Sequence, residues 1–537
     1  MRERVDLRLL PAAATAWAAA AIALRSAAAA WAVAGALLLI GAGALLLIAM
    51  VCASACRSSR TVRAACIALA AAAGLGAGVA ASVGVRVHDR ERAPITSFDG
   101  AGVLVAVEVT EWPRQRGGEP GGHLDSSRVL VPATALTVSR GSVASPGPAL
   151  PARGSVLLLG SAFNFGSVVP GERIILRARV LRSTRPGLVA AVLVASGEPR
   201  VLGRAPPHLR AAAAVRRSLG VVAADALPVD AAGLLPALVL GDESATLPTV
   251  RGDFQDSGLM HLTAVSGANF SIVSLCVLGL CAAVGLPISW RVAVTAVAIV
   301  AFVGVVGPTG SVVRAAVMGL LGVAALALRR GRQPFAALLA AIVVLMLVRP
   351  TLARDIGFAL SVAATAGLIL WAPTVRDRLA VRGVPDTVAG LLAVTVVAQV
   401  VTMPLVVVLS GRVPLGALPA NLLAGPVIPV ITVVGTLAAV LSAPLPVLAE
   451  VGVRATGPEL WWVLAVARWC AKLPVVVLPG GAWAAVVMVA GFGLVGGLWQ
   501  HVRRDGERAR ARGGGDRGPP SGTGRGRGGR KRPRRGR

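Results

Sequence analysis

Long apolar runs follow one another along most of this chain and predict membrane-spanning helices. A helix needs roughly 17–25 mostly apolar residues to cross a bilayer. Runs of about this kind lie at 9–24, 28–51, 62–84, 257–284, 287–307, 311–328, 334–349, 354–372, 386–410, 413–442, 458–478 and 482–499. The pattern indicates a polytopic α-helical membrane protein with about 10–12 transmembrane helices.

Basic residues gather in four stretches between these runs and predict the orientation of the chain. They lie at 57–63, 329–332, 376–382 and from Arg503 onward. Short loops rich in Lys and Arg stay in the cytoplasm. Placing all four there puts the N-terminus and C-terminus inside and residues 86–230 outside. We therefore expect a multi-pass protein of the plasma (inner) membrane, with a start that is not cleaved.

Residues 86–205 have a different pattern, with five β-branched runs separated by turn-rich pieces. The predicted strands are 103–109, 127–131, 155–159, 173–180 and 188–195. Five strands in so short a segment are typical of a small β-barrel, OB-like, or of a small sandwich. OB folds often bind single strands through aromatic and basic residues. Aromatic residues such as Trp112, Phe163 and Phe165 are few here, which favours a module that binds no DNA.

Amphipathic helices are predicted at 211–219 and 231–240, after the β-rich segment. The expected division of the chain has five parts: N-terminal transmembrane helices (1–85), an extracytoplasmic β-rich OB-like module after the third helix (86–205), amphipathic connecting helices (206–256), a second transmembrane domain (257–500) and a disordered basic cytoplasmic tail (501–537).

Composition excludes an ordinary soluble protein. Of the 537 residues, 55% are hydrophobic and 15% charged, and the mean hydropathy is +0.75. Of the net charge of +29, +11 lies in the 35 residues from Arg503 onward, a Gly-, Pro- and Arg-rich tail that cannot bury a core. The six cysteines lie in or beside apolar runs, so we expect small buried side chains and no disulfide framework.

A cluster of polar residues opens the run at 257–284. It contains His261, Thr263, Ser266 and Asn269, with Gly267 among them. Polar groups in hydrocarbon are costly unless they face protein or water. On a helix Ser266 and Asn269 would point in one direction. The cluster is either a small-residue packing face or part of a lined path through the membrane.

Four further segments interrupt the later apolar runs with polar residues. They are 307–319 with Arg314, 349–361 with Arg354 and Asp355, 398–404 with Gln399, and 411–426 with Asn421. The last holds three prolines and three glycines, which predict a broken or re-entrant helix. Each segment alone is more typical of helix packing, whereas five in one bundle favour a lined path.

The segment His261-Leu-Thr-Ala-Val-Ser-Gly-Ala-Asn269 resembles the His-Leu-Leu-Ala-Val-Ser-Gly-Leu-His signature of the ComEC competence family, with departures at Thr263 and Asn269. Gly241-Asp-Glu-Ser244 and the segments that begin at Ser311, Asp355, Gln399 and Ala420 are similar to other blocks of that family. The resemblance covers roughly residues 10–500.

The resemblance implies an inner-membrane channel that passes single-stranded DNA into the cytoplasm during natural transformation. The residues expected to line the path are His261, Ser266, Gly267, Asn269, Arg314, Gln399 and Asn421. Charged or structural residues expected near the path are Asp242, Arg354 and Asp355. Conduction makes no bond, so we expect no catalytic residue, no metal and no cofactor.

Many ComEC proteins carry a C-terminal metallo-β-lactamase-like domain whose zinc motif needs clustered histidines. The five histidines of this chain are all more than 30 residues apart, so we expect a form that lacks this domain. No ATP-binding loop motif occurs. The resemblance therefore implies a cytoplasmic ATP-driven DNA translocase and an extracytoplasmic DNA receptor as partners. The nuclease is either absent or on a separate polypeptide, and membrane lipid and further copies of this chain in a homo-oligomer are the other partners considered.

Two other functions stay open. A secondary transporter for a small solute would favour midplane charges and internal repeats, and the chain shows no clear repeat. A membrane-embedded hydrolase could use His261 or Ser266 with Asp242 or Asp256, although no spacing fixes these residues in a triad.

Overall fold

A computed structural model describes residues 6–53, 60–115, 128–140, 148–263, 265, 267–328 and 333–477. Residues Met1–Met403 and Arg412–Val476 form one compact unit, and Pro404–Gly411 with the chain from Val477 onward form a second. The elements below belong to the first unit, apart from the last residues of α13 and β8. The predicted span at 482–499 and the predicted disordered tail lie outside the described residues.

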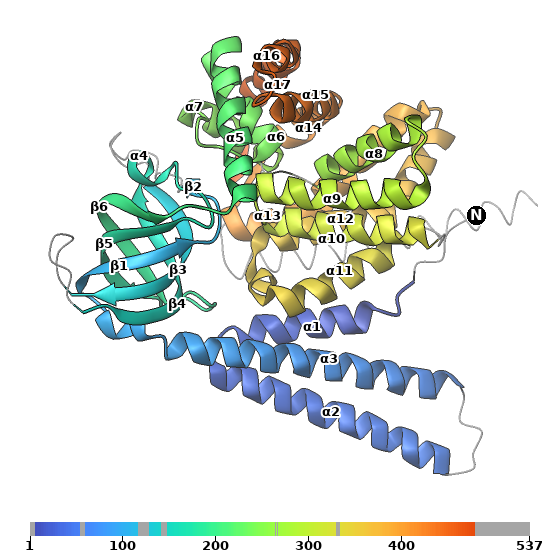
Figure 1. The fold of residues 1–537 in the computed structure, drawn as a ribbon. Helices are drawn as coiled ribbons and strands as arrows, with labels where there is room; N and C mark the ends of the chain where they lie inside the picture. The colour runs from blue at the N-terminus through green and yellow to red at the C-terminus, as the bar shows by residue number, and fades with distance from the viewer. Residues whose placement is uncertain are drawn as a thin grey trace, which may run out of the picture. The chain divides into compact units, whose positions relative to one another are not determined.

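Three helices open the chain, as predicted: α1 (Leu10–Ala23), α2 (Ala27–Ala53) and α3 (Arg60–Glu91). The turn before α2 is stabilised by Ser26, whose hydroxyl accepts a hydrogen bond from the backbone N–H of Ala29. Small residues let these helices approach closely. For example, a Cβ on Gly76 would lie 2.6 Å from the Thr15 side chain. Figure 1 shows α3 running past α1 and α2 to the β-rich module.

The β-rich module contains all five predicted strands and one short additional strand. Its strands are β1 (Gly102–Val109), β2 (Arg114–Gln115), β3 (Arg128–Ser139), β4 (Leu150–Ser161), β5 (Arg173–Arg182) and β6 (Ala191–Gly203). They form one sheet in the order β1-β5-β6-β4-β3-β2, and β1 also pairs with β3. The short helices η1 (Pro94–Phe98) and α4 (Ala162–Phe165) flank it. Alternate residues such as Val103, Val105 and Val107 are buried in the core of the module.

Helices are found at both predicted positions, 211–219 and 231–240, although the second is buried on nearly all sides rather than amphipathic. Both belong to a helical layer that also contains helices from the end of the chain. This layer consists of α5 (Pro207–Ala226), α6 (Val229–Leu240), α7 (Pro248–Asp256), α14 (Ala417–Ala424), α15 (Ile428–Leu441), α16 (Pro446–Ala455), α17 (Gly457–Cys470) and the paired strands β7 (Arg412–Pro414) and β8 (Val475–Val477). Its helices share one core that includes Leu234, Phe254 and Leu460. The axes of α14 and α15 meet at 55°, which confirms the expected break.

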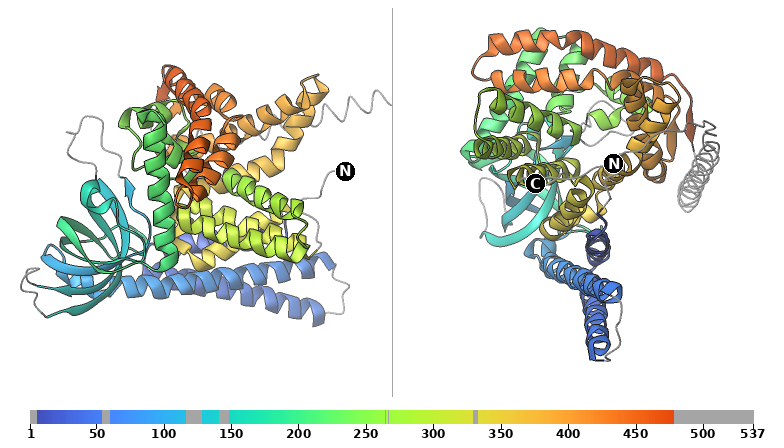
Figure 2. Two further views of the ribbon diagram at one scale, coloured as in Figure 1. Left: turned by 45° about the horizontal axis from the view of Figure 1, so that its top comes forward. Right: turned by 90° about the vertical axis from the view of Figure 1, so that its right-hand side faces the viewer.

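Six further helices lie between Gly267 and Ser410: α8 (Gly267–Ala283), α9 (Ile288–Val306), α10 (Gly310–Ala327), α11 (Pro334–Val348), α12 (Ile356–Val381) and α13 (Asp386–Ser410). Figure 2 shows the β-rich module at one end of the blue helix α3. Short 3-10 turns precede α8 and α12, as η2 (Met260–Leu262) and η3 (Pro350–Arg354). The helices α8, α9 and α10 share a core, and α11 packs against α1.

Six of the described helices are long and apolar enough to cross a membrane, or seven if the bent pair α14–α15 is one span. Four shorter apolar helices, α1, α6, α8 and α11, accompany them. This is consistent with a polytopic membrane protein. Of the predicted span 257–284, α8 covers Gly267–Ala283, and Thr263 lies before this helix.

Candidate functional site

Arg314 on α10 lies at the meeting point of α8, α10 and α12. Its side chain is buried, with the residue only 5% exposed, so it does not reach the surface. The Nε–H group donates a hydrogen bond to Ser361 Oγ on α12 at 2.9 Å. A second donor, Nη1, lies 3.2 Å from the Met318 sulfur. On the α8 side, a Cβ added to Gly267 would lie 2.8 Å from Nη2. Three sequence segments expected to line a path are thus joined at one guanidinium.

The charge of Arg314 has no carboxylate partner among the residues that the structure describes. An uncompensated buried charge costs several kcal/mol of solvation free energy. The nearby groups are a hydroxyl, a thioether and a glycine, which solvate a cation only in part. A site of this kind favours an anion that approaches it.

Asn269 connects α8 to the end of α6. It is 3% exposed, and its Nδ2 donates to the carbonyl of Leu238 at 3.2 Å. Helix α6 then ends at Gly241, whose φ of +67° is left-handed and favours glycine. Asn269 therefore has a packing role, and its place beside a path stays a prediction. Ser266 lies outside the described residues.

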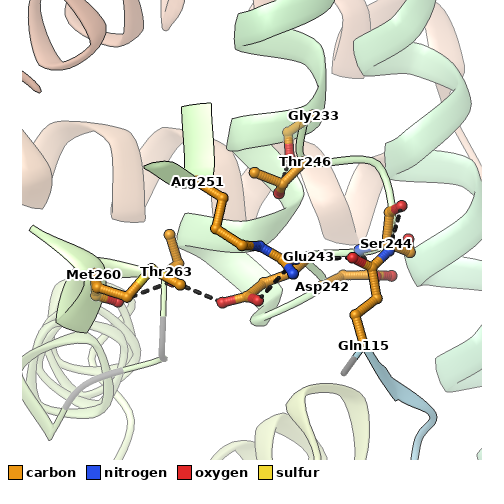
Figure 3. A network of polar contacts seen from close by, with 9 residues as sticks. All are labelled: Gln115, Gly233, Asp242, Glu243, Ser244, Thr246, Arg251, Met260 and Thr263. Carbon is orange, nitrogen blue, oxygen red and sulfur yellow. Dashed lines mark hydrogen bonds and ion pairs between the residues drawn. The ribbon is translucent and has the colours of Figure 1, made fainter. Parts of the chain in front are cut away.

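Two carboxylates follow Gly241, and each pairs with an arginine. Asp242 Oδ2 lies 3.0 Å from Arg216 Nη2 on α5. Glu243 Oε2 lies 3.2 Å from Arg251 Nη2 on α7, while its Oε1 accepts a hydrogen bond from Thr263 Oγ1 at 2.7 Å. Figure 3 shows this network around Glu243. Asp242, which was expected near the path, thus forms a structural ion pair. Its neighbour Glu243 contacts Thr263, in the segment that leads into α8.

Arg216 also contacts the β-rich module. Its guanidinium lies 4.7 Å from the ring centroid of Trp112, and its Nη1 donates to the carbonyls of Leu240 and Val305. Burial lowers the pKa of Arg216, and the ion pair with Asp242 acts in the opposite direction. The indole of Trp112 faces Gly307, where a Cβ would lie 2.8 Å from Cδ1. Only a glycine leaves room for this ring.

Asp355 has a clear local role, whereas Arg354 does not. The Asp355 Oδ1 atom accepts a hydrogen bond from the backbone N–H of Phe358 at 2.6 Å and caps α12. The start of α10 packs close to this cap, because a Cβ on Gly310 would lie 2.7 Å from Oδ1. Arg354 is exposed and, within the described part of the chain, forms no ion pair with Asp355.

The structure does not bring Gln399 and Asn421 to Arg314. Gln399 is half-buried on α13, which packs against α12 through Val397 and Val401. Asn421 donates from Nδ2 to Ala417 O within its own helix, at 2.8 Å. These two residues belong to other helix contacts, and their place on a path remains a prediction.

His261 is exposed, and its Nδ1 lies 3.1 Å from the carbonyl oxygen of Gly258. The carboxylates considered as its partners are engaged elsewhere. Asp256 lies 3.4 Å from Arg412, and Asp242 pairs with Arg216. Among the described residues no hydrogen bond joins His261 to either carboxylate, so a hydrolytic triad is not assembled there.

Sequence patterns missed several residues that organise this region: Ser361, Glu243, Arg251, Gln115, Arg216 and Arg349. The carboxylate of Glu243 lies in the quoted Gly-Asp-Glu-Ser element and could have been singled out. The others are joined by contacts between distant segments, for which no local spacing exists.

Residues 238–504 match the family model described as Competence protein. The match supports a competence-type protein. It covers just under half of the chain and includes the segments that meet at Arg314 and the Glu243 network. No curated protein and no solved structure gave a match.

Proposed function

We propose that this competence-type protein is a ComEC-like channel that passes a single strand of DNA across the plasma membrane into the cytoplasm. The family match suggests involvement in DNA uptake. The observation that carries the proposal is the buried guanidinium of Arg314, which lies between Gly267 and Ser361 and pairs with no carboxylate among the described residues. A DNA strand carries one phosphate anion per nucleotide, and arginine binds phosphate with a fork of N–H groups.

The proposed chemistry is conduction. Arg314 would stabilise a passing phosphate, while neighbouring hydroxyl and amide groups would replace part of its hydration. Conduction requires that such a site bind strongly enough to admit the strand and weakly enough to release it. The remaining expected path residues, His261, Ser266, Asn269, Gln399 and Asn421, would line other parts of the route.

We further propose that the module is an OB-like barrel. The strand pairings run from β1 through β5, β6, β4 and β3 and return to β1, which supports closure and disfavours a two-sheet sandwich. The only parallel pairing is between β4 and β6 in the described ladder. Helix α4 lies between β4 and β5 in sequence.

In this proposal the module lies outside the cell and both termini lie inside. The distribution of basic loops supports that orientation. Energy for transport would come from a cytoplasmic ATP-driven translocase, and the strand would come from an extracytoplasmic DNA receptor. A separate nuclease, surrounding lipid and further copies of this chain complete the set of proposed partners.

The test is complementation of a transformable strain that lacks its own channel. Arg314→Gln removes the charge and leaves a shorter, polar amide side chain. Because no described carboxylate pairs with Arg314, neutralisation removes a desolvation cost that offsets the lost hydrogen bond to Ser361, and the thermal stability of the purified protein should change little. Transformation frequency should nevertheless fall at least about tenfold, and Arg314→Lys should retain part of it, since lysine keeps the charge without the fork.

Arg376→Gln is the matched control. Arg376 is an exposed arginine near the end of α12 that pairs with Asp377. Its replacement should leave transformation unchanged. If the wild-type chain restores no uptake while reaching the membrane, the proposed function is wrong. If Arg314→Gln transforms like the wild type, the guanidinium does not belong to the path.

A further inference from the structure

Three arginines of the helical layers hold one short segment of the β-rich module. The segment is Glu111–Gln115, which follows β1 and includes β2. Arg349 pairs with Glu111 and donates to the carbonyl of Pro308 at 2.7 Å. Arg216 stacks on Trp112, as described above. Arg251 donates from Nη2 to Gln115 Oε1 at 2.8 Å. The module is therefore fixed at three points by side chains from three different elements.

The side-chain amide of Gln115 makes two hydrogen bonds, one with Arg251 and one with the loop that contains Ser244. Its Oε1 accepts from Arg251, while its Nε2 donates to the carbonyl of Ser244 at 2.9 Å. In Figure 3, Gln115 approaches the loop from β2, and Arg251 lies between Gln115 and Glu243. One guanidinium nitrogen, Arg251 Nη2, thus contacts a module residue and the carboxylate of Glu243.

The other oxygen of Glu243 reaches Thr263, four residues before Gly267. A continuous chain of polar contacts therefore runs Gln115–Arg251–Glu243–Thr263. It begins in the module and ends at the segment that leads into α8. The side chains of Arg251 and Glu243 are 19% and 31% exposed, so their ion pair is only partly screened by water. Removal of one member leaves its partner with an unmet polar group in a largely buried place.

We infer that Gln115 and Arg251 are positioning residues that set the start of α8 relative to the β-rich module. Neither touches Arg314. They act through Glu243 and Thr263. Thr263 lies four residues before Gly267, which contacts the Arg314 guanidinium. Movement of the module at Gln115 therefore changes the geometry of the Arg314 site. The expected effect on transport rests on the proposed function, whereas the effect on the start of α8 does not.

The decisive measurement is amide hydrogen exchange of the full chain in lipid nanodiscs. Gln115→Ala removes both contacts of the amide. It should accelerate exchange at residues 259–263 and 267–270 about fivefold to tenfold, because local opening becomes easier when a charge-assisted hydrogen bond is lost. Gln115→Glu keeps an oxygen for Arg251 but loses the donor to Ser244, so it should restore only part of the protection. Gln115→Met has a similar size without either polar contact and should exchange as fast as Gln115→Ala; rescue by methionine would show that the side chain merely fills space.

Thr246→Val provides a matched control in the same loop. Thr246 donates to the carbonyl of Gly233 at 3.2 Å and takes no part in the chain from Gln115 to Thr263. Its replacement should leave exchange at 259–263 and 267–270 unchanged. Equal acceleration by Thr246→Val, or no acceleration by Gln115→Ala, would overturn the inference.

Transformation frequency supplies the second readout through a double-mutant cycle. The effects of Gln115→Ala and Thr263→Val should be less than additive on a logarithmic scale, because both cut the same chain of contacts. The effects of Gln115→Ala and Thr246→Val should add. Full additivity in the first pair would refute the positioning role in transport. If the exchange results are as expected but the wild-type chain restores no uptake, the proposed function is wrong. The positioning role of Gln115 and Arg251 is then still supported.

Discussion

Gly267→Ala tests the packing of α8 against Arg314 with the smallest available perturbation. The added Cβ would lie 2.8 Å from Arg314 Nη2, whereas ordinary heavy-atom contacts lie at about 3.5–4.0 Å. The guanidinium must therefore retreat by roughly 0.7–1.2 Å. Its Nε–Ser361 Oγ bond of 2.9 Å would then stretch beyond the range of a hydrogen bond.

The free-energy terms of this substitution partly offset each other. Loss of a hydrogen bond to a charged group costs about 1.5–3 kcal/mol. Replacement of glycine by alanine in a helix stabilises by about 1 kcal/mol. The net loss of stability is thus about 0.5–2 kcal/mol. That is small for a large helical protein, and the amount of protein in the membrane should change little. Transport should fall about tenfold or more, because a displaced Arg314 no longer meets the strand.

The assay compares membrane abundance with transformation frequency for each variant. Gly279→Ala on the same helix is the matched control, since a Cβ at Gly279 has no heavy atom within 4 Å. It should leave both quantities unchanged. A parallel fall of abundance and transformation in Gly267→Ala would mean that Gly267 only allows close helix packing. Unchanged transformation would show that the position of Arg314 has no bearing on uptake.

Three further outcomes are expected. Asp355→Ala removes the cap of α12 and should lower stability by about 1 kcal/mol, measured as a lower thermal midpoint, whereas Arg354→Ala at the exposed neighbouring residue should have a smaller effect. A reporter fused after Gly118, outside the described residues, should be extracytoplasmic, and one fused after Arg504 should be cytoplasmic; the opposite result at Gly118 would invert the topology. The purified protein should show no nuclease activity with Mn²⁺, Mg²⁺ or Zn²⁺, and metal-dependent degradation that survives stringent purification would contradict this expectation.

Local patterns predicted the strands well because their cause is local. Val103, Val105 and Val107 alternate with residues on the other face, so one side of β1 is apolar throughout. The break between α14 and α15 was equally predictable from prolines and glycines. In both cases the backbone preference of a few neighbouring residues decides the outcome.

The start of α8 could not be predicted in this way. Residues 257–284 are apolar enough for one helix, yet Gly258 has a φ of +74° and the helix begins nine residues later. At Gly258 a Cβ would lie 2.6 Å from the Cβ of Ala417, a residue from a distant segment. Tertiary packing therefore determines where this helix begins. Hydrophobic periodicity reports only which residues avoid water.

The same limit applies to the candidate site. Arg314 and Gly267 were each visible as unusual residues in apolar runs, but their contact depends on how α8 and α10 pack. Gln115 and Arg251 are 136 residues apart, and nothing near Gln115 indicates that its amide faces an arginine. Gln399 and Asn421 stood out for the same reason as Arg314, and the structure gives them separate surroundings.

The docking of the module bears on whether it binds DNA. In an OB fold, the loops after the first and fourth strands frame the face that binds single strands. On the proposed OB-like arrangement, the first of these begins with Glu111–Gln115, which the three arginines hold. The second lies between β5 and β6, where Arg90 of α3 donates hydrogen bonds to the carbonyls of Ser183, Arg185, Gly187 and Val189.

Both loops are thus engaged with helices of the same chain. A loop whose carbonyls are bound to Arg90 has fewer groups to offer a DNA backbone, and a Trp112 ring stacked on Arg216 has one face fewer to offer a base. This use of the loops favours a module that fixes the entrance of the helical domain over one that captures DNA by itself. It also explains why a separate receptor for the strand belongs in the proposed mechanism.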